Sequence, residues 1–208
     1  MHVASMHISE PILPFRRFHV SAGFLWRILL LVALLLIAPF LAGCRDEEKT
    51  AAAQGGAVMT LSSESLRDGS VPKEFTCDGE DKSLALTWTV PPANAKSLAL
   101  MVTDPDAPGG SFTHWVVFNL PANINGLPEG VPTQGQLAHG GRQGKTDFGK
   151  VGYGGPCPPA GSTHRYVFTL YALDTMLDVD AGAPRDHVEA AMQGHVVAKG
   201  ELVGRYRR

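Results

Sequence analysis

The sequence has no excess of basic residues and no internal repeat. Lysine and arginine together number 18 against 20 aspartates and glutamates, so the formal net charge is −2. A chain with this balance has no strong electrostatic attraction for nucleic acid. The length of 208 residues suggests one domain or at most a small pair.

Motifs of several enzyme classes are also missing. No His-x-His or His-Glu-x-x-His spacing supports a metal centre, and no Gly-x-Ser-x-Gly elbow supports a serine hydrolase. The segment HGGRQGKT at 139–146 has His139 where a nucleotide-binding loop requires its first glycine, and no apolar strand precedes it. The DFG at 147–149 lacks the accompanying kinase catalytic-loop motif. We therefore expect no enzyme activity, no cofactor and no metal site.

One long apolar run is present, at residues 28–40. It is shorter than the about 20 residues that a transmembrane helix needs. Arg16, Arg17 and Arg27 precede it. Basic residues followed by a short apolar run predict a secretory signal.

Small residues stand directly before Cys44, in the sequence Leu41-Ala-Gly-Cys. This arrangement resembles a bacterial lipobox, in which the chain is cut before the cysteine and the sulfur receives a diacylglycerol. An ordinary cleaved signal with an incidental cysteine is the alternative. Arg45, in place of an aspartate, favours onward transport to the outer membrane. The expected location is the bacterial cell envelope, with the protein lipid-anchored and facing the periplasm.

Removal of residues 1–43 leaves 15 basic and 19 acidic residues and a formal charge of −4. Residues 44–57 are rich in small and charged side chains and have no apolar period, which predicts a flexible tether. The folded domain is expected at residues 58–208, which is long enough for one hydrophobic core.

Within this domain, abundant glycine and proline separate short apolar runs, a pattern typical of a β-rich fold with long loops. One helix is expected at 184–195, which opens with Pro184, spaces its apolar residues at helical intervals and meets Gly194 near its end. Strands are expected at residues 84–90, 97–103, 113–120, 165–173 and 196–203.

Alternation along three strands predicts apolar faces that end in polar groups, because alternate side chains share a face. The three expected sets are Leu98, Leu100 and Val102 ending at Asp104; His114 with Val116, Phe118 and Leu120; and His164 and Tyr166 with Phe168 and Leu170. If the polar ends meet, the core opens into a small polar pocket.

Each of these polar residues also has an ordinary structural explanation. A histidine at the margin of an apolar strand is more often a satisfied core or edge residue than a ligand. Asp104-Pro-Asp106 is a common turn former, and Tyr166 is a favourable strand residue. Their joint placement beside a rigid loop favours a pocket. That loop, at 152–166, contains three prolines and four glycines.

Several separated motifs resemble the phosphatidylethanolamine-binding protein family, also called Raf kinase inhibitor proteins, in its bacterial YbhB/YbcL branch. The motifs are DPDAP at 104–108, HW at 114–115, GPCPP at 155–159, HRY at 164–166, LPEG at 127–130 and GHVVAKGELVGRY at 194–206. The resemblance implies a mostly β (α+β) fold, namely a β-sandwich core with a few peripheral helices and one small anion pocket. It also implies the ligand-binding residues, which are Asp104, Asp106, His114, Pro158, Pro159, His164 and Tyr166.

An anion such as phosphate needs donors, which a protonated histidine, a tyrosine hydroxyl and loop amides can supply. Asp104 and Asp106 would repel an anion that they faced. We therefore expect the carboxylates to pair with histidines or loop donors and to keep the imidazoles oriented and charged, because a nearby carboxylate raises a histidine pKa.

With Cys44 assigned to lipid, Cys77 and Cys157 remain as a pair in an oxidising compartment. A disulfide between them is expected, and it would close a loop of about 80 residues and tie the FTCDGED segment to the pocket wall.

The sequence thus predicts a lipid-anchored envelope protein that binds a small anion, either phosphate or a phosphoethanolamine-like headgroup. The alternative is a protein-interaction or inhibitor module that acts on an envelope or host protein, with the pocket regulatory. The expected partners are the small anion and, through the N-terminal lipid, the membrane, with no nucleic acid; a protein partner and a homodimer stay open.

Overall fold

The computed structural model describes residues 57–208. The predicted signal segment, Cys44 and all but the last residue of the predicted tether lie outside the described residues. Within the described part of the chain, no helix is long and apolar enough to cross a membrane.

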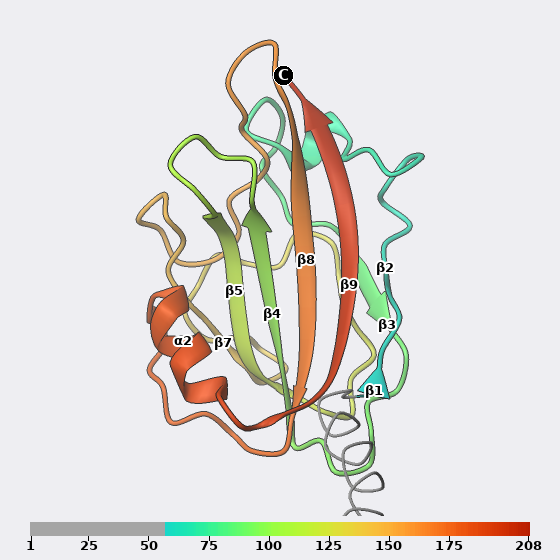
Figure 1. Cartoon of the computed structure of the whole chain (residues 1–208), viewed down its shortest axis with the longest axis vertical. Helices are drawn as coiled ribbons and strands as arrows, with labels where there is room; N and C mark the ends of the chain where they lie inside the picture. Colours follow the sequence, from blue (N-terminus) through green and yellow to red (C-terminus); the bar gives the residue numbers. More distant parts are fainter. Residues whose placement is uncertain (1–56) are drawn as a thin grey trace, which may run out of the picture. The chain divides into compact units, whose positions relative to one another are not determined.

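Six strands form the larger of two sheets (Figure 1). In spatial order they are β1 (Ala57–Val58), β9 (Val196–Arg207), β8 (Thr163–Leu173), β4 (Ser97–Asp104), β5 (Phe112–Pro121) and β7 (Arg142–Gln143). The β1–β9 pair is parallel and all the others are antiparallel. The long central strands therefore bring the end of β4 and the starts of β5 and β8 to the same end of the sheet.

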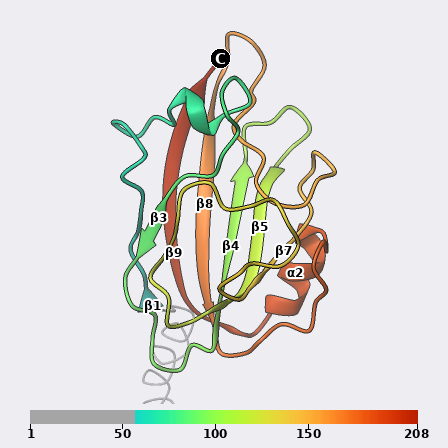
Figure 2. The same cartoon turned by 180° about the vertical axis from the view of Figure 1, so that it is seen from behind.

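A second sheet of three short strands covers one face of the first (Figure 2). Its strands are β2 (Leu61–Ser62), β3 (Leu86–Trp88) and β6 (Gly126–Leu127), in the order β2-β3-β6. The larger hydrophobic core lies between the sheets and includes Leu86 and Trp88 from β3 together with Leu100 and Phe168 from the main sheet.

One α-helix, α2 (Arg185–Met192), and one 3-10 turn, η2 (Lys73–Phe75), complete the regular structure of residues 57–208. The helix buries Val188 and Met192 in a second, smaller core on the other face of the main sheet. Pro184 is its N-cap residue, and Gly194 after its end has a φ of +79°, a conformation that glycine adopts without strain. The helix expected from the sequence is confirmed.

The fold is mostly β, as the sequence predicted. The expected strands at 97–103, 113–120, 165–173 and 196–203 are present, each with up to four further residues. The expected strand at 84–90 is reduced to Leu86–Trp88 because it pairs with two-residue strands. Strands of two residues carry too little alternation to be recognised from the sequence.

The predicted apolar faces are correct for β4 and β8. Leu98, Leu100 and Val102 belong to the core between the sheets, whereas Ala99 and Met101 face the helix side. On β8, the predicted set Tyr166, Phe168 and Leu170 faces the core between the sheets.

The predicted face of β5 is wrong, because two irregularities interrupt its alternation. Val102 pairs with Trp115 but Thr103 pairs with Thr113, so His114 is an extra residue opposite β4. The second irregularity includes Asn119, whose φ is +56°. As a result, Val116 and Phe118 face the helix side, Leu120 lies in the core between the sheets, and the His114 ring packs against Tyr166. A β-bulge re-aims side chains in this way.

Candidate functional site

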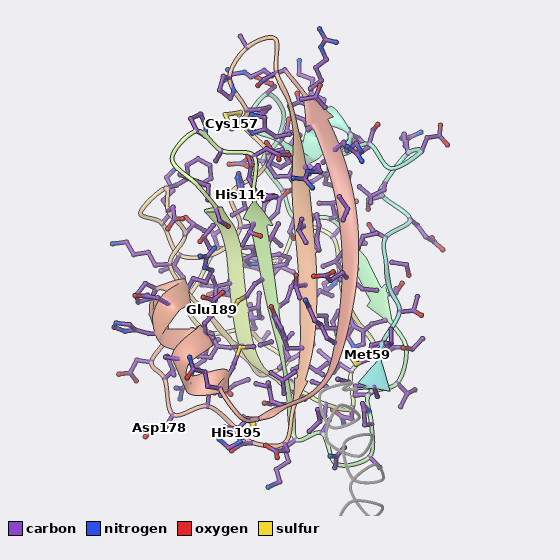
Figure 3. The ribbon with its side chains drawn as sticks, in the orientation of Figure 1. Met59, His114, Cys157, Asp178, Glu189 and His195 are labelled. Carbon is purple, nitrogen blue, oxygen red and sulfur yellow. A yellow bond between two sulfur atoms is a disulfide. The ribbon has the colours of Figure 1, made fainter. Side chains whose placement is uncertain are left out.

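A pocket of about 310 Å³ lies where the ends of β4, β5 and β8 meet the proline-rich loop. His114 and Cys157 mark this end of the molecule, and His195 and Asp178 lie near the opposite end (Figure 3). The residues that line the pocket are Asp104, Ala107, Pro108, Phe112, His114, Phe148, Cys157, Pro158, Pro159, His164 and Arg208. Five of the seven predicted ligand residues are among them; Asp106 and Tyr166 are not.

Asp104 and His164 form a buried hydrogen-bonded pair at the base of the pocket. His164 Nδ1 lies 2.7 Å from Asp104 Oδ2, and the backbone N–H of Asp106 donates to Asp104 Oδ1 over 2.8 Å. Nδ1 must carry a hydrogen in this arrangement, because a carboxylate accepts and does not donate. His164 Nε2 is therefore the imidazole nitrogen that remains for a ligand.

His114 has a different partner from the one expected. Its Nδ1–H donates to the carbonyl oxygen of Gly154 over 2.7 Å. Burial lowers the pKa of His114 below its ordinary value of 6.5, and the hydrogen bond to Gly154 and the charge of Asp104 only partly oppose this effect. The expectation that the aspartates keep both imidazoles charged is thus wrong for His114, because desolvation outweighs the carboxylate.

Asp106 pairs with Arg165 and does not enter the pocket. Arg165 donates to Asp106 through Nη2 at 2.6 Å, Nε at 2.9 Å and its backbone N–H at 2.9 Å. These hydrogen bonds, those of the side chain first, lower the pKa of Asp106 to about 2. Asp106 therefore fastens the loop after β4 to β8, a structural role in place of the predicted ligand role.

Tyr166 is fully buried and lies beneath the pocket lining. Its ring meets that of His114 edge-on, with centroids 5.1 Å apart. The hydroxyl group has no hydrogen-bond partner among residues 57–208. Burial, and secondarily the charge of Asp104, raise the pKa of Tyr166, so its hydroxyl keeps its proton.

The wall that contains Pro158 and Pro159 is fixed by several bonds to the segment around η2. Cys157 forms a disulfide with Cys77, the pairing expected from the sequence. The backbone N–H of Gly155 donates to Asp81 Oδ1 over 2.6 Å. A Cβ on Gly155 would lie 2.4 Å from the carbonyl oxygen of Phe75, so this close approach of two backbones requires glycine.

Six lining residues were not predicted as ligands, and three of them, Phe112, Phe148 and Arg208, bear on the chemistry of the pocket. The Phe112 and Phe148 rings have centroids 4.8 Å apart, and the His114 and Phe148 centroids are 5.2 Å apart. These rings form an aromatic wall. Phe148 belongs to the DFG segment at 147–149. Arg208 follows β9, and nothing local in the sequence connects it with the pocket.

The fold and the pocket define a class of small β-sandwich proteins with a pocket at the strand ends. In the part of the chain that the structure describes, no group of three or more His, Cys, Asp or Glu side chains could hold a metal ion. The family model for phosphatidylethanolamine-binding protein matches residues 62–207. The chain therefore belongs to the phosphatidylethanolamine-binding protein family.

Two curated relatives match most of the described domain. A UPF0098 protein of Methanothermobacter thermautotrophicus is 51% identical over 151 residues, which cover 72% of this chain and 99% of the relative. A UPF0098 protein of Aquifex aeolicus is 45% identical over 157 residues, which cover 74% of this chain and 91% of the relative.

Two solved structures share the fold. A phosphatidylethanolamine-binding protein homologue of Chlamydia trachomatis, CT736, is 38% identical with a TM-score of 0.66, covering 73% of this chain and 98% of that chain. YbcL of Escherichia coli, described as a member of the mammalian family, is 32% identical with a TM-score of 0.67, covering 72% of this chain and 98% of that chain. No enzyme activity appears in the names of these four proteins.

Proposed function

We propose that this protein binds a small oxyanion, either phosphate or a phosphate-bearing headgroup, in the pocket at the strand ends. The observation that carries the proposal is the buried Asp104–His164 pair, in which the carboxylate orients the imidazole and Nε2, when protonated, can donate to an anion. A hydrogen-bonded imidazole and a guanidinium at one small site are typical anion ligands.

The pocket functions in binding and has no catalytic role in this proposal. His114 and His164 have Nδ1 engaged by fixed acceptors, Gly154 and Asp104, so Nε2 is the nitrogen of each ring that remains for a ligand. A Ser or Thr that could act as a nucleophile is missing from the residues that line the pocket.

We further propose that the chain is a lipoprotein of the bacterial envelope, anchored through Cys44 and facing the periplasm. The sequence around Cys44 supports this part of the proposal. Expression of the full chain and of its Cys44→Ser variant in a bacterial host tests it. We expect membrane recovery and a diacylglyceryl mass increase for the first protein and neither for the second. Membrane recovery of both proteins without a mass increase would contradict lipidation.

Binding is tested with residues 53–208, which form one compact unit. This unit covers the region shared with the Methanothermobacter relative, 99% of whose length matches this chain. Phosphate and phosphoethanolamine are titrated while the histidine NMR signals are followed. Saturable shifts at His114 and His164, lost in His164→Ala and kept in His195→Ala, are the expected result. Silence from both pocket histidines would remove the proposal and turn the search toward protein partners.

A further inference from the structure

We propose that Arg208 supplies the permanent positive charge of the pocket and contacts the bound anion directly, with Asp78 holding its guanidinium in place. This inference rests on the proposed anion binding. It names the group whose charge most offsets the electrostatic cost of placing an anion in the pocket.

The charges around the pocket single out Arg208. It is the one lysine or arginine among the described residues that line the pocket. Asp104 brings a negative charge that offsets any charge on His164. Arg165 is nearby, but three of its N–H groups are occupied by Asp106.

His114 does not fill this role at neutral pH, because its burial favours the uncharged imidazole. With Nδ1–H given to Gly154, the neutral ring presents an Nε2 that accepts hydrogen bonds and cannot donate one to an anion. An arginine keeps its charge throughout the pH range in which proteins are folded. An electrostatic attraction for an anion that persists at neutral and alkaline pH therefore needs Arg208.

The backbone and side chain of Arg208 are both anchored. Its backbone oxygen accepts from the Gly161 N–H at 2.7 Å, and its own backbone N–H donates to the carbonyl oxygen of Ser162 at 3.3 Å. Its Nε donates to Asp78 Oδ1 at 3.1 Å, and Asp78 Oδ2 accepts from the Tyr206 hydroxyl at 2.8 Å. Tyr206 thus fixes the carboxylate that fixes the guanidinium.

This anchoring leaves the two amino groups of Arg208 for a ligand. One of them, Nη1, lies 3.7 Å from Cys157 Sγ, a weak acceptor on the pocket wall. A planar pair of N–H groups matches two oxygens of a tetrahedral oxyanion such as phosphate or sulfate. The aromatic wall of Phe112 and Phe148 lies in the same pocket and can pack against an organic substituent of a phosphate ester.

Asp78 adjoins Cys77, whose disulfide to Cys157 ties this segment to the pocket wall. The covalent bond therefore holds the carboxylate that positions Arg208. Asp78 is a positioning residue in this scheme, because its oxygens contact Arg208 and Tyr206 and it is absent from the lining.

The test compares the sulfate affinity of the 53–208 unit and of its variants by calorimetric titration at pH 8.5. Sulfate is used because its charge is constant over the pH range of the experiments. Arg208→Gln is expected to lower the affinity about tenfold or more, and Arg208→Lys less, because a lysine keeps the charge but loses the paired geometry. The matched control is Arg207→Gln, which removes a neighbouring exposed charge that does not line the pocket; its affinity should stay within about twofold.

A direct readout separates contact from a merely structural ion pair. The Arg208 side-chain NMR signals should shift saturably with sulfate at the same midpoint as the calorimetric curve. Unshifted Arg208 signals together with wild-type affinity of Arg208→Gln would overturn the inference, while histidine shifts in the same titration would leave the proposed function standing. Absence of any binding to the wild-type unit would overturn both. Melting curves of each variant verify folding, and Arg208→Lys provides the result if Arg208→Gln unfolds.

Asp78→Asn tests the positioning role. The variant removes a negative charge near the anion, which by itself would strengthen binding. We expect a loss of about threefold instead, and no further loss when Arg208→Gln is already present. A gain in affinity would show that Asp78 merely opposes the anion. Affinities for inorganic phosphate, phosphoethanolamine and vesicles that contain phosphatidylethanolamine are then compared. The comparison distinguishes free phosphate from a lipid headgroup as the source of the anion.

Discussion

Two ends of the molecule carry the same pair of side chains in different surroundings. At the pocket end, His164 Nδ1 lies 2.7 Å from Asp104, and the side chains are 9% and 5% exposed. At the opposite end, His195 Nδ1 lies 2.8 Å from Asp174, and the side chains are 46% and 44% exposed (Figure 3). Almost equal distances thus accompany very different access to water.

The difference indicates that burial, and not the hydrogen bond itself, decides how much a His–Asp pair contributes to stability. Water solvates and screens the exposed pair, so its formation changes the free energy of unfolding little. In the buried pair, each partner depends on the other for its hydrogen bond, and the geometry is held by surrounding packing. The far-end pair therefore provides a natural control for the pocket pair.

The largest expected effect comes from the disulfide, which links the pocket wall covalently to the segment around η2. Replacement of Cys77 and Cys157 by serine should reduce the free energy of unfolding by about 4 kcal/mol, because the bond closes a loop of 80 residues. Anion affinity should fall as well, since Asp78 would lose its fixed place. Urea unfolding and sulfate titration measure the two effects; unchanged affinity in a folded double variant would show that the disulfide stabilises the wall without shaping the pocket.

Removal of the buried carboxylate should have the next largest effect. Asp104→Ala leaves His164 Nδ1 and the backbone N–H of Asp106 without their acceptor, which should cost about 3 kcal/mol of unfolding free energy. The matched far-end variant Asp174→Ala should cost under about 0.5 kcal/mol. Equal losses in urea unfolding would contradict the distinction between the two ends.

Acidification should destabilise the ligand-free pocket through His114. Its pKa in the folded protein lies below 6.5, so the unfolded chain takes up a proton first as the pH falls. Stability is therefore lost as the pH drops below 6.5, and the loss levels off once the folded protein is protonated too. The variant His114→Asn, whose amide can still donate to Gly154, should lack this component of the pH profile in thermal melts.

The same protonation should strengthen anion binding, because charged His114 gains an Nε2–H donor. Sulfate affinity should rise as the pH falls below 6.5 and keep a plateau set by Arg208 at alkaline pH. An affinity that is independent of pH would exclude His114 as a ligand, and an affinity that vanishes at alkaline pH would exclude Arg208 as the main charge.

The smallest expected effect concerns Asp106 and Arg165. The hydrogen bonds from Arg165 lower the folded-state pKa of Asp106 from its ordinary 3.8 to about 2. Their contribution to the free energy of unfolding is therefore present above pH 3.8 and is lost as the pH falls toward 2. Asp106→Asn should remove this loss of unfolding free energy at acid pH, as measured in unfolding experiments. It should leave the sulfate affinity at neutral pH within about twofold of the wild-type value. A large loss of affinity would return Asp106 to the binding site.

Much of the scaffold could be predicted from the sequence. The long strands and α2 were recognisable because alternation and helical spacing are local patterns over eight or more residues. The core faces of β4 and β8 were predictable for the same reason. The grouping of Asp104, His164, Pro158 and Pro159 in one pocket was implied by the resemblance to the family.

Other parts of the site were decided by tertiary structure. The bulge that re-aims His114 depends on how β5 pairs with β4, and the low pKa of that histidine depends on how completely its neighbours bury it. The partner of Asp106 depends on how β4 pairs with β8, and the arrival of Arg208 at the pocket depends on the register between β8 and β9. The sequence by itself determined which strands form and which polar residues end them, because those features follow from side-chain periodicity. Partner choice, burial and charge state were left to the packed molecule, because they depend on distances between residues that are far apart in the chain.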